Sequence, residues 1–320
     1  MSDLLYTNGP VPYREDFYRS LRENGVKVCF AAAARDLLPQ LETERPARVI
    51  VPEFSSLALA ALRYRKRFDF KVVSLCDDSL DMIGGNDFGW KHRLARRMVP
   101  RMVDEVILHS PEVRAWYRER FGKGLLMPVM ADERRVRPEL ERLLPLSQRL
   151  RPTEKPVVAF VGRFVQLKNI PSLIRAFGPL ADKSQLVLIG DGPERMRLES
   201  MAPSAFFTGH LSGDELLAWY NLIDVLVLPS TQEAYGAVTG EALMAGARVV
   251  VSRKAGSAGL VRGGENGYVV DPLDVEGITA AVSRLLETVP SGRPLSLRDN
   301  LHPYRFETCI QALLREIKAL

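Results

Sequence analysis

Two carboxylates, Glu233 and Glu241, stand on either side of a short glycine-containing turn. Gly236 lies between them, and the composition of residues 238–245 is compatible with a helix. Backbone N–H groups at a helix start have no intrahelical partner, and the helix dipole there favours a phosphate or a sugar hydroxyl. The spacing predicts a pocket for a polyhydroxylated, phosphorylated ligand. The simpler interpretation is a solvated loop acid followed by a first-turn acid that complements the helix dipole.

Two cations occupy another predicted loop. The apolar stretch 156–161 leads into Gly162 and Arg163, and Lys168 follows just before a helix with an apolar face. Two fixed cations suit the negative charge that develops on a departing diphosphate. Taken singly, each is also compatible with an ordinary surface cation.

The elements that must position these residues alternate between strand and helix. Residues 224–230 read as a buried strand before Glu233, residues 185–190 as a strand before a glycine turn, and residues 205–210 as a strand before a helix over 214–222. This order predicts an α/β fold with a doubly wound parallel sheet. Ligands of such sheets bind at the carboxyl edge of the strands.

Four motifs resemble, in the same order, the carboxyl-terminal half of the retaining GT-B glycosyltransferases of family 4. The resemblance covers roughly residues 155 to 285 and implies two Rossmann-like doubly wound domains that face each other across a cleft. The motifs are Gly162-Arg163 with Lys168, Gly190-Asp191-Gly192-Pro193, Phe207-Thr208-Gly209, and Glu233 with Glu241 and the following Ala242-Leu243-Met244-Ala245-Gly246.

The resemblance also implies a role for each matched residue. A carboxylate accepts two hydrogen bonds from a vicinal diol, which suits Glu241 for the ribose of a nucleotide. His210 also fits an ordinary solvated residue. The implied sites are diphosphate-binding residues Arg163, Lys168, Gly236, Ala237 and Val238; nucleoside-binding residues Glu241, Thr208, Gly209 and His210; and a catalytic Glu233 beside the donor sugar.

The first half of the chain carries fewer signals. By the resemblance it binds the acceptor, and the loop after its first strand, with Asn8, Gly9 and Arg14, is the expected acceptor-side loop. Family members usually carry a glycine pair in this loop, where this chain has Gly9 followed by Pro10. Contact between this loop and the donor phosphate is therefore an open question.

An acid pair stands where the family commonly has a histidine after a central strand. Asp77 and Asp78 follow the strand-like residues 71–76, and either carboxylate is a candidate catalytic group that orients or deprotonates an acceptor hydroxyl. The alternative is that the pair caps the next helix. His92 and His109 do not replace the missing histidine convincingly in the sequence.

Breaker-rich residues 145–156 predict the boundary between the two halves. We therefore expect an acceptor-binding domain over 1–150, a nucleotide-sugar-binding domain over 151–303, and a C-terminal helix over 304–320 that crosses back to the first domain. A chain of 320 residues has room for two such domains.

Composition predicts a cytoplasmic enzyme without a metal or organic cofactor. Cys29, Cys76 and Cys309 lie far apart, without the paired spacing of a zinc site. We find no secretory leader, no long apolar run and no Asp-x-Asp signature for a metal. The nucleotide diphosphate-sugar would be a substrate, held by cations of the chain itself.

The excess of positive over negative charge is confined to the first half of the chain. Residues 1–150 hold 26 Lys and Arg against 21 Asp and Glu, whereas the rest of the chain balances. In residues 91–101 cations alternate with Leu94, Met98 and Val99, which suits peripheral contact with an anionic membrane, although a solvated helix face gives the same pattern. Few aromatic residues accompany the cations, which argues against nucleic acid as a partner.

These observations predict a retaining glycosyltransferase that moves a sugar from a nucleotide diphosphate-sugar to a hydroxyl of a saccharide or lipid-linked acceptor, in cell-surface polysaccharide or glycolipid synthesis. A catalytically silent GT-B partner or membrane-docked subunit is the first alternative. A nicotinamide enzyme is the second, but Arg195 stands where a dinucleotide fingerprint after Gly190 and Gly192 needs its third glycine.

Overall fold

The computed structural model describes residues 3–7, 14–30, 34–52, 55–77, 79–80, 83 and 90–320. The chain divides into two compact units, which we call unit 1 (residues 1–131 and 304–320) and unit 2 (residues 132–303). The sequence pattern places the division near residue 150. The structure assigns helices α7 (Glu133–Arg142) and α8 (Leu144–Leu150) to unit 2, because both contact α11 (Gly213–Leu222) of that unit.

Unit 1 contains a six-stranded sheet in the order β2-β1-β3-β4-β5-β6, and all its described neighbours pair in parallel. Its strands are β1 (Asp3–Thr7), β2 (Val26–Phe30), β3 (Arg48–Pro52), β4 (Lys71–Cys76), β5 (Glu105–Leu108) and β6 (Leu125–Leu126). Its helices include α1 (Glu15–Glu23), α2 (Leu37–Glu44), α3 (Ser56–Phe68), α5 (Trp90–Met102), α6 (Pro111–Phe121) and α14 (Phe306–Lys318), with a 3-10 turn at Ala34–Asp36.

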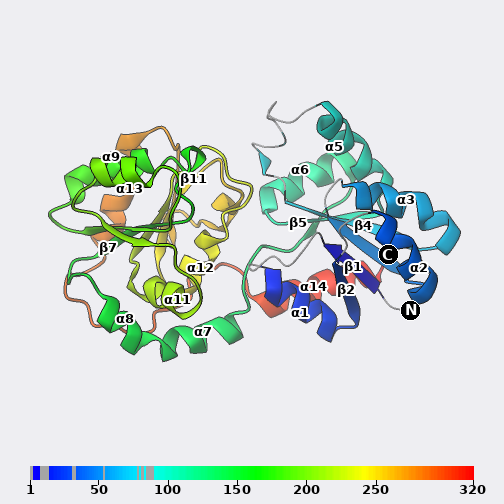
Figure 1. Ribbon diagram of the computed structural model, residues 1–320, viewed down its shortest axis with the longest axis horizontal. Helices are drawn as coiled ribbons and strands as arrows, with labels where there is room; N and C mark the ends of the chain where they lie inside the picture. The colour runs from blue at the N-terminus through cyan, green and yellow to red at the C-terminus, as the bar shows by residue number, and fades with distance from the viewer. Residues whose placement is uncertain are drawn as a thin grey trace. The chain divides into compact units, whose positions relative to one another are not determined.

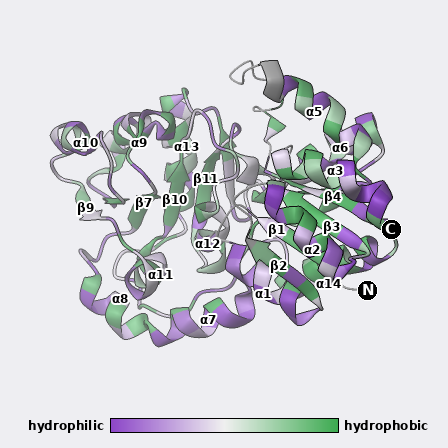
Figure 2. Cartoon of the chain, turned by 45° about the vertical axis from the view of Figure 1, so that its right-hand side comes forward, coloured by the Kyte–Doolittle hydropathy of each residue, from purple (hydrophilic) through white to green (hydrophobic). Residues whose placement is uncertain are grey.

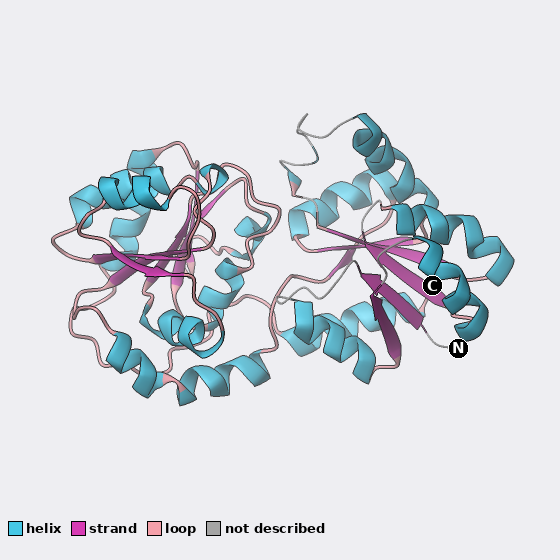
Figure 3. Cartoon of the chain, in the orientation of Figure 1, coloured by secondary structure: helices cyan, strands magenta, loops and turns pink. Residues whose placement is uncertain are grey.

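Both faces of this sheet are buried, because its strands are continuous apolar runs whose side chains alternate between the faces. Val49 and Val51 of β3 lie in one core with α2, α3 and α6, whereas Ile50 lies in the other with α1 and α14. Figure 3 shows the helices on the two faces. The C-terminal helix completes the second core through Phe306 and Ile310, and Figure 1 shows it in red beside α1.

Unit 2 repeats the architecture, with a six-stranded parallel sheet in the order β12-β11-β10-β7-β8-β9. Its strands are β7 (Val157–Val161), β8 (Gln185–Ile189), β9 (Phe206–Gly209), β10 (Val225–Leu228), β11 (Arg248–Ser252) and β12 (Gly267–Val270). Beside α7, α8 and α11 stand α9 (Ile170–Phe177), α10 (Arg195–Met201), α12 (Val238–Met244) and α13 (Val275–Leu286), with 3-10 turns at Gln166–Lys168, Gly178–Leu180 and Gly256–Leu260.

The strand order of unit 2 reverses between β7 and β10. The chain proceeds from β7 outward to β9 and then returns to add β10, β11 and β12 on the other side. Loops that leave two such central strands diverge and leave a crevice at the carboxyl edge, which is where open α/β sheets bind ligands. The predicted cations follow β7 and the predicted carboxylates follow β10.

The hydropathy of the elements agrees with these layers. In Figure 2 the strands of both sheets are mostly hydrophobic, whereas α1 and α7 are largely hydrophilic. Among the helices in the described ranges, none combines the length and the apolar character needed to cross a bilayer.

Candidate active site

The loops after β7 and β8 are in direct backbone contact. The amide of Phe164 donates to the carbonyl of Asp191 at 2.8 Å. Gly190 makes this approach possible, because its φ is +139° and a β-carbon there would overlap the carbonyl oxygen of Gly162. Arg163 lies in this interlocked pair of loops with an exposed side chain. In the described part of the chain, no hydrogen bond or ion pair engages its guanidinium.

Lys168 and Glu233 form an ion pair between the loops after β7 and β10. The backbone amide of Thr231 donates to the carbonyl of Leu167 at 2.9 Å, which fixes the two loops together. The lysine side chain is 23% exposed and the glutamate side chain 13% exposed, so each charge is partly withdrawn from water. The hydroxyl of Ser230 lies 3.4 Å from the same carboxylate oxygen of Glu233.

The backbone of the turn between the two predicted carboxylates is tightly constrained by its neighbours. Gly236 adopts a φ of +90°, and a β-carbon there would lie 2.6 Å from Cδ2 of Leu228. The carbonyl of Tyr235 accepts a hydrogen bond from the amide of Ser257 at 2.8 Å. Ala237 and Val238 follow at the start of α12 and are partly exposed.

Glu241 is paired with a buried tyrosine. The hydroxyl of Tyr220, on α11, donates to Oε2 of Glu241, on α12. Burial raises the pKa of the Glu241 carboxyl, and the hydrogen bond from Tyr220 offsets part of that rise. Burial, followed by the negative charge of Glu241, also raises the pKa of the Tyr220 hydroxyl, which therefore remains a hydrogen-bond donor at neutral pH.

The predicted nucleoside-binding backbone lies at the end of β9. Thr208 and Gly209 are partly exposed, and the carbonyl of Gly209 accepts from the amide of Gly190 at 2.9 Å. His210 is exposed. Within the described residues no hydrogen bond or ion pair joins His210 to the Lys168–Glu233 pair, so the structure brings together only part of the predicted set.

The predicted acceptor-side residues are only partly described. Asn8, Gly9 and Asp78 lie outside the described residues. Asp77 and Arg14 form a partly buried ion pair, which His109 joins with its Nε2 at 2.7 Å from Asp77. Burial acts to raise the pKa of Asp77, but the hydrogen bond and charge of His109, together with the Arg14 guanidinium, outweigh it and hold the pKa at about 2.

Sequence reasoning assigned no carboxylate partner to three side chains that contact the predicted carboxylates. Ser230 ends an apolar run, Tyr220 sits among the apolar residues of a helix, and His109 directly precedes a Ser-Pro helix start. Each has an ordinary structural interpretation in the sequence. Only the contact with a carboxylate distant in the chain distinguishes these residues, and no local pattern encodes that contact.

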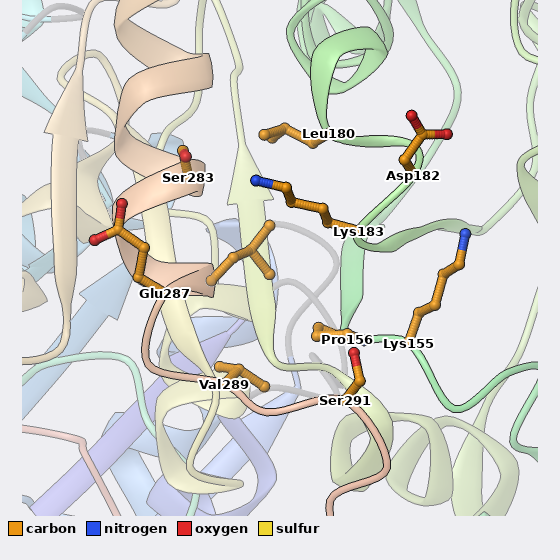
Figure 4. A pocket seen from close by; sticks show the side chains of 10 residues that line it. Lys155, Pro156, Leu180, Asp182, Lys183, Ser283, Glu287, Val289 and Ser291 are labelled. Atoms are coloured by element: carbon orange, nitrogen blue, oxygen red, sulfur yellow. The ribbon is translucent and has the colours of Figure 1, made fainter.

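A cavity of about 520 Å³ lies elsewhere in unit 2 (Figure 4). Lys155 and Pro156, just before β7, line it together with Lys183, just before β8. It therefore lies at the amino-terminal edge of the sheet, away from the loops described above. None of the predicted site residues contributes to it.

The family comparison matches the part of the chain that carries the Lys168–Glu233 pair and Glu241. A model described as "Glycosyl transferases group 1" matches residues 155–288. This region is thus similar to glycosyl transferases of group 1. The assignment to family 4 is finer than this match supports.

Characterised relatives of this group 1 region include two proteins of Mycolicibacterium smegmatis. One is a GDP-mannose-dependent alpha-mannosyltransferase, 36% identical over 175 residues, which are 52% of this chain and 42% of the relative. The other is a GDP-mannose-dependent alpha-(1-6)-phosphatidylinositol monomannoside mannosyltransferase, 30% identical over 225 residues, which are 63% of this chain and 59% of the relative. The matches thus span about half the length of these relatives.

Solved structures extend the likeness to both units. HepE of Anabaena, in complex with UDP, has a TM-score of 0.77 at 16% sequence identity, and the match covers 100% of each chain. Sucrose-phosphate synthase from Thermosynechococcus elongatus has a TM-score of 0.70 at 21% identity, with 98% of this chain and 82% of that one covered. The chain that carries this group 1 region has the GT-B fold.

Proposed function

We propose that this chain is a retaining glycosyltransferase that transfers a sugar from a nucleotide diphosphate-sugar to a hydroxyl of a saccharide or lipid-linked acceptor. The observation that carries the proposal is the ion pair of Lys168 with Glu233 between two loops at the carboxyl edge of unit 2, inside the region matched by the family model. Glu241 lies on α12, the helix that follows the Glu233 loop. A fold alone would not support an activity, since unrelated functions share folds.

The proposed donor site assigns separate tasks to these groups. Lys168 and Arg163 stabilise the negative charge on the departing nucleoside diphosphate. Glu233, now paired with Lys168, would accept hydrogen bonds from hydroxyls of the donor sugar. Glu241 would accept from the ribose diol, with Tyr220 holding one carboxylate oxygen. We assign no part of this reaction to a metal or an organic cofactor.

The names of the relatives suggest the first substrates to examine. Two are described as GDP-mannose-dependent, and one of these as acting on a phosphatidylinositol monomannoside. We therefore propose GDP-mannose as the first donor and a mannosylated lipid as the first acceptor. Retention of configuration and the sugar identity rest on the family resemblance and need direct measurement.

Turnover tests the proposal. The full chain is incubated with radiolabelled GDP-mannose, UDP-glucose or ADP-glucose and with octyl α-mannopyranoside, and release of nucleoside diphosphate and labelled glycoside are both measured. We expect product from one donor, with the anomeric configuration retained, and a loss of at least about a hundredfold in Glu233→Gln. Binding of a nucleoside diphosphate without any turnover would contradict the enzyme and support a catalytically silent partner.

We also propose that α5 contacts an anionic membrane. The exposed side of α5 carries two parallel rows of side chains, one basic and one apolar, and the members of each row are four residues apart. The apolar side chains are 44 to 49% exposed. The buried Val99 faces the other way, into the core of unit 1. A basic row beside an apolar one suits insertion among anionic head groups. The rows are Arg93, Arg97 and Arg101 on one side and Leu94, Met98 and Met102 on the other.

A further inference from the structure

Three charged or titratable side chains of unit 1 converge at the carboxyl edge of its sheet. Asp77 follows β4 directly and His109 follows β5 directly, and the two strands pair in parallel with Cys76 opposite Leu108. Asp77 and His109, the residues that follow these two strands, are therefore neighbours. Arg14, just before α1, is 8% exposed and reaches the same point, where His109 is 7% exposed.

The donors in this cluster converge on one oxygen. Both Nη2 of Arg14 and Nε2 of His109, the latter at 2.7 Å, contact Oδ1 of Asp77. Nη2 of Arg14 also lies 3.1 Å from Nε2 of His109, within hydrogen-bond distance. On the other side of the imidazole, Nδ1 lies 2.6 Å from the carbonyl oxygen of Met127, which only accepts hydrogen bonds. The geometry therefore assigns a proton to Nδ1, which fixes the orientation of the ring.

The second oxygen of Asp77 is placed differently. Among the residues that the structure describes, none engages Oδ2, and the Asp77 side chain is 26% exposed although its partners are buried. A pKa of about 2 means that the carboxyl is ionised at neutral pH and is a weak base. Such a group accepts a hydrogen bond well but does not retain a transferred proton.

We propose that Arg14 and His109 are positioning residues, which fix Asp77 so that its Oδ2 accepts a hydrogen bond from the hydroxyl that attacks the donor sugar. This inference rests on the proposed function. In the reaction the bond between the anomeric carbon and the diphosphate oxygen breaks, and a bond to the acceptor oxygen forms. The proton of the hydroxyl leaves with the diphosphate and does not stay on Asp77.

This role differs from that of a clamp that only stabilises the fold. A structural clamp predicts that its loss lowers the melting temperature and leaves turnover per folded molecule unchanged. A positioning role predicts a loss in kcat with the donor site intact, because the donor residues lie in unit 2. Orientation of an attacking hydroxyl contributes to the chemical step and not to nucleotide affinity.

The test compares Asp77→Asn with the wild-type full chain, using radiolabelled GDP-mannose, with octyl α-mannopyranoside or with water alone as the nucleophile. We expect kcat to fall about a hundredfold, while KM for the donor and the affinity for GDP stay within about twofold. His109→Ala should behave similarly, and His109→Gln, which keeps a side-chain N–H for Asp77, should retain at least about tenfold more activity than His109→Ala. Glu119→Gln, an exposed acid on α6, is the matched control and should leave kcat unchanged.

The outcomes separate this inference from the proposed function. Turnover by the wild type together with an unchanged kcat in Asp77→Asn would overturn the inference alone. A wild type that binds GDP but turns over no donor would contradict the proposed function, and the inference would fall with it.

A measurement independent of turnover covers the case in which Asp77→Asn does not fold. Nitrogen chemical shifts of the histidine rings in the wild type, with His109 assigned from His109→Gln, report the protons on each ring nitrogen. We expect Nδ1 of His109, which faces the carbonyl oxygen of Met127, to carry a proton. A bare Nδ1 would overturn the assigned geometry.

Discussion

Three carboxylates of this chain have different partners, and the partner determines what each carboxylate does. Glu233 pairs with a lysine of a neighbouring loop, Glu241 accepts a hydrogen bond from a tyrosine hydroxyl, and Asp77 is held by an arginine and a histidine. Burial raises the pKa of Glu241, whereas the hydrogen bond and charges of its partners hold the pKa of Asp77 low. The Glu241 carboxylate therefore suits a ligand that supplies hydrogen-bond donors. The Asp77 carboxylate suits a role as a fixed hydrogen-bond acceptor.

The raised pKa of Glu241 predicts a stability that depends on pH. A raised folded-state pKa contributes stability that is present below the unfolded pKa of about 4.3 and is lost as pH rises through the folded value. Glu241→Gln does not ionise, so its melting temperature should exceed that of the wild type near neutral pH and approach it near pH 4. The measurement is the melting temperature of both proteins across that range. A difference that does not change with pH would contradict the assignment.

The same substitution should weaken nucleotide binding. An amide accepts only through its oxygen and repels one donor of a ribose diol, whereas the carboxylate accepts through both oxygens. We expect nucleoside diphosphate affinity to fall by about tenfold or more in Glu241→Gln. Increased stability together with decreased affinity would identify Glu241 as a functional group and not a structural one.

The lowered pKa of Asp77 predicts the opposite dependence of stability on pH. A lowered folded-state pKa contributes stability that is present above the unfolded value of about 3.9 and is lost as pH falls through about 2. Asp77→Asn should therefore cost about 2–3 kcal/mol of unfolding free energy near neutral pH. Denaturant unfolding at a series of acidic pH values should show this difference shrinking, and a constant difference would be the contrary result.

At the scale of elements, the proposed donor site depends on loops that contact each other through their backbones. Gly190 lies against the carbonyl of Gly162, and the amide of Phe164 donates into the same loop pair. A side chain at Gly190 must separate the loops that present Arg163 and Lys168. The position of the two cations is thus a consequence of a glycine on a neighbouring strand.

Gly190→Ala tests this dependence. We expect a loss of about 1–3 kcal/mol in stability, from the overlap and the positive φ, together with weaker nucleoside diphosphate binding. Gly178→Ala is the matched control, because nothing lies within 4 Å of a β-carbon there and its φ of −44° is ordinary. Calorimetric binding and thermal unfolding of both variants are compared. Equal stability and equal nucleoside diphosphate affinity in the two variants would show that neither property depends on the loop contact.

The elements themselves were largely predictable from the sequence, because continuous apolar runs such as residues 224–230 must form buried parallel strands. The contacts across elements were not. Lys168 and Glu233 lie 65 residues apart, and their pairing follows from the strand order β10-β7-β8. His109 looked like a residue before a helix cap, and Ser110 is indeed such a cap, with its hydroxyl accepting from the amide of Val113. Because β4 pairs with β5, His109 also lies beside Asp77.

At the scale of the whole molecule, the two units resemble known proteins in different ways. The group 1 family match lies within unit 2, whereas the likeness of unit 1 to solved structures is one of fold at low sequence identity. The sequence therefore supplied more candidate residues for the proposed donor side than for the proposed acceptor side. The excess positive charge also belongs to the first half of the chain.

That charge predicts binding of the full chain to vesicles of phosphatidylglycerol but not of phosphatidylcholine. Each arginine near such a surface contributes about 1 kcal/mol, so a triple change of Arg93, Arg97 and Arg101 to Glu should abolish co-sedimentation at low salt. Replacing Leu94, Met98 and Met102 by Ser should weaken it. The control, Met196→Ser with Leu273→Ser, alters exposed apolar residues of unit 2 and should have no effect. Undiminished binding in both triple variants would exclude α5 as the contact.

The most direct test of the central claim, that the loops at the carboxyl edge of unit 2 bind the nucleotide part of a sugar donor, is titration calorimetry of the full chain with GDP, UDP and ADP. We predict binding of one of them, weakened by about tenfold or more in Lys168→Ala, since a charge-assisted hydrogen bond contributes about 1.5–3 kcal/mol. Lys183→Ala, at the opposite edge of the same sheet, should bind as the wild type does. Absence of binding to all three nucleotides, or equal affinity in the wild type and Lys168→Ala, would contradict the account.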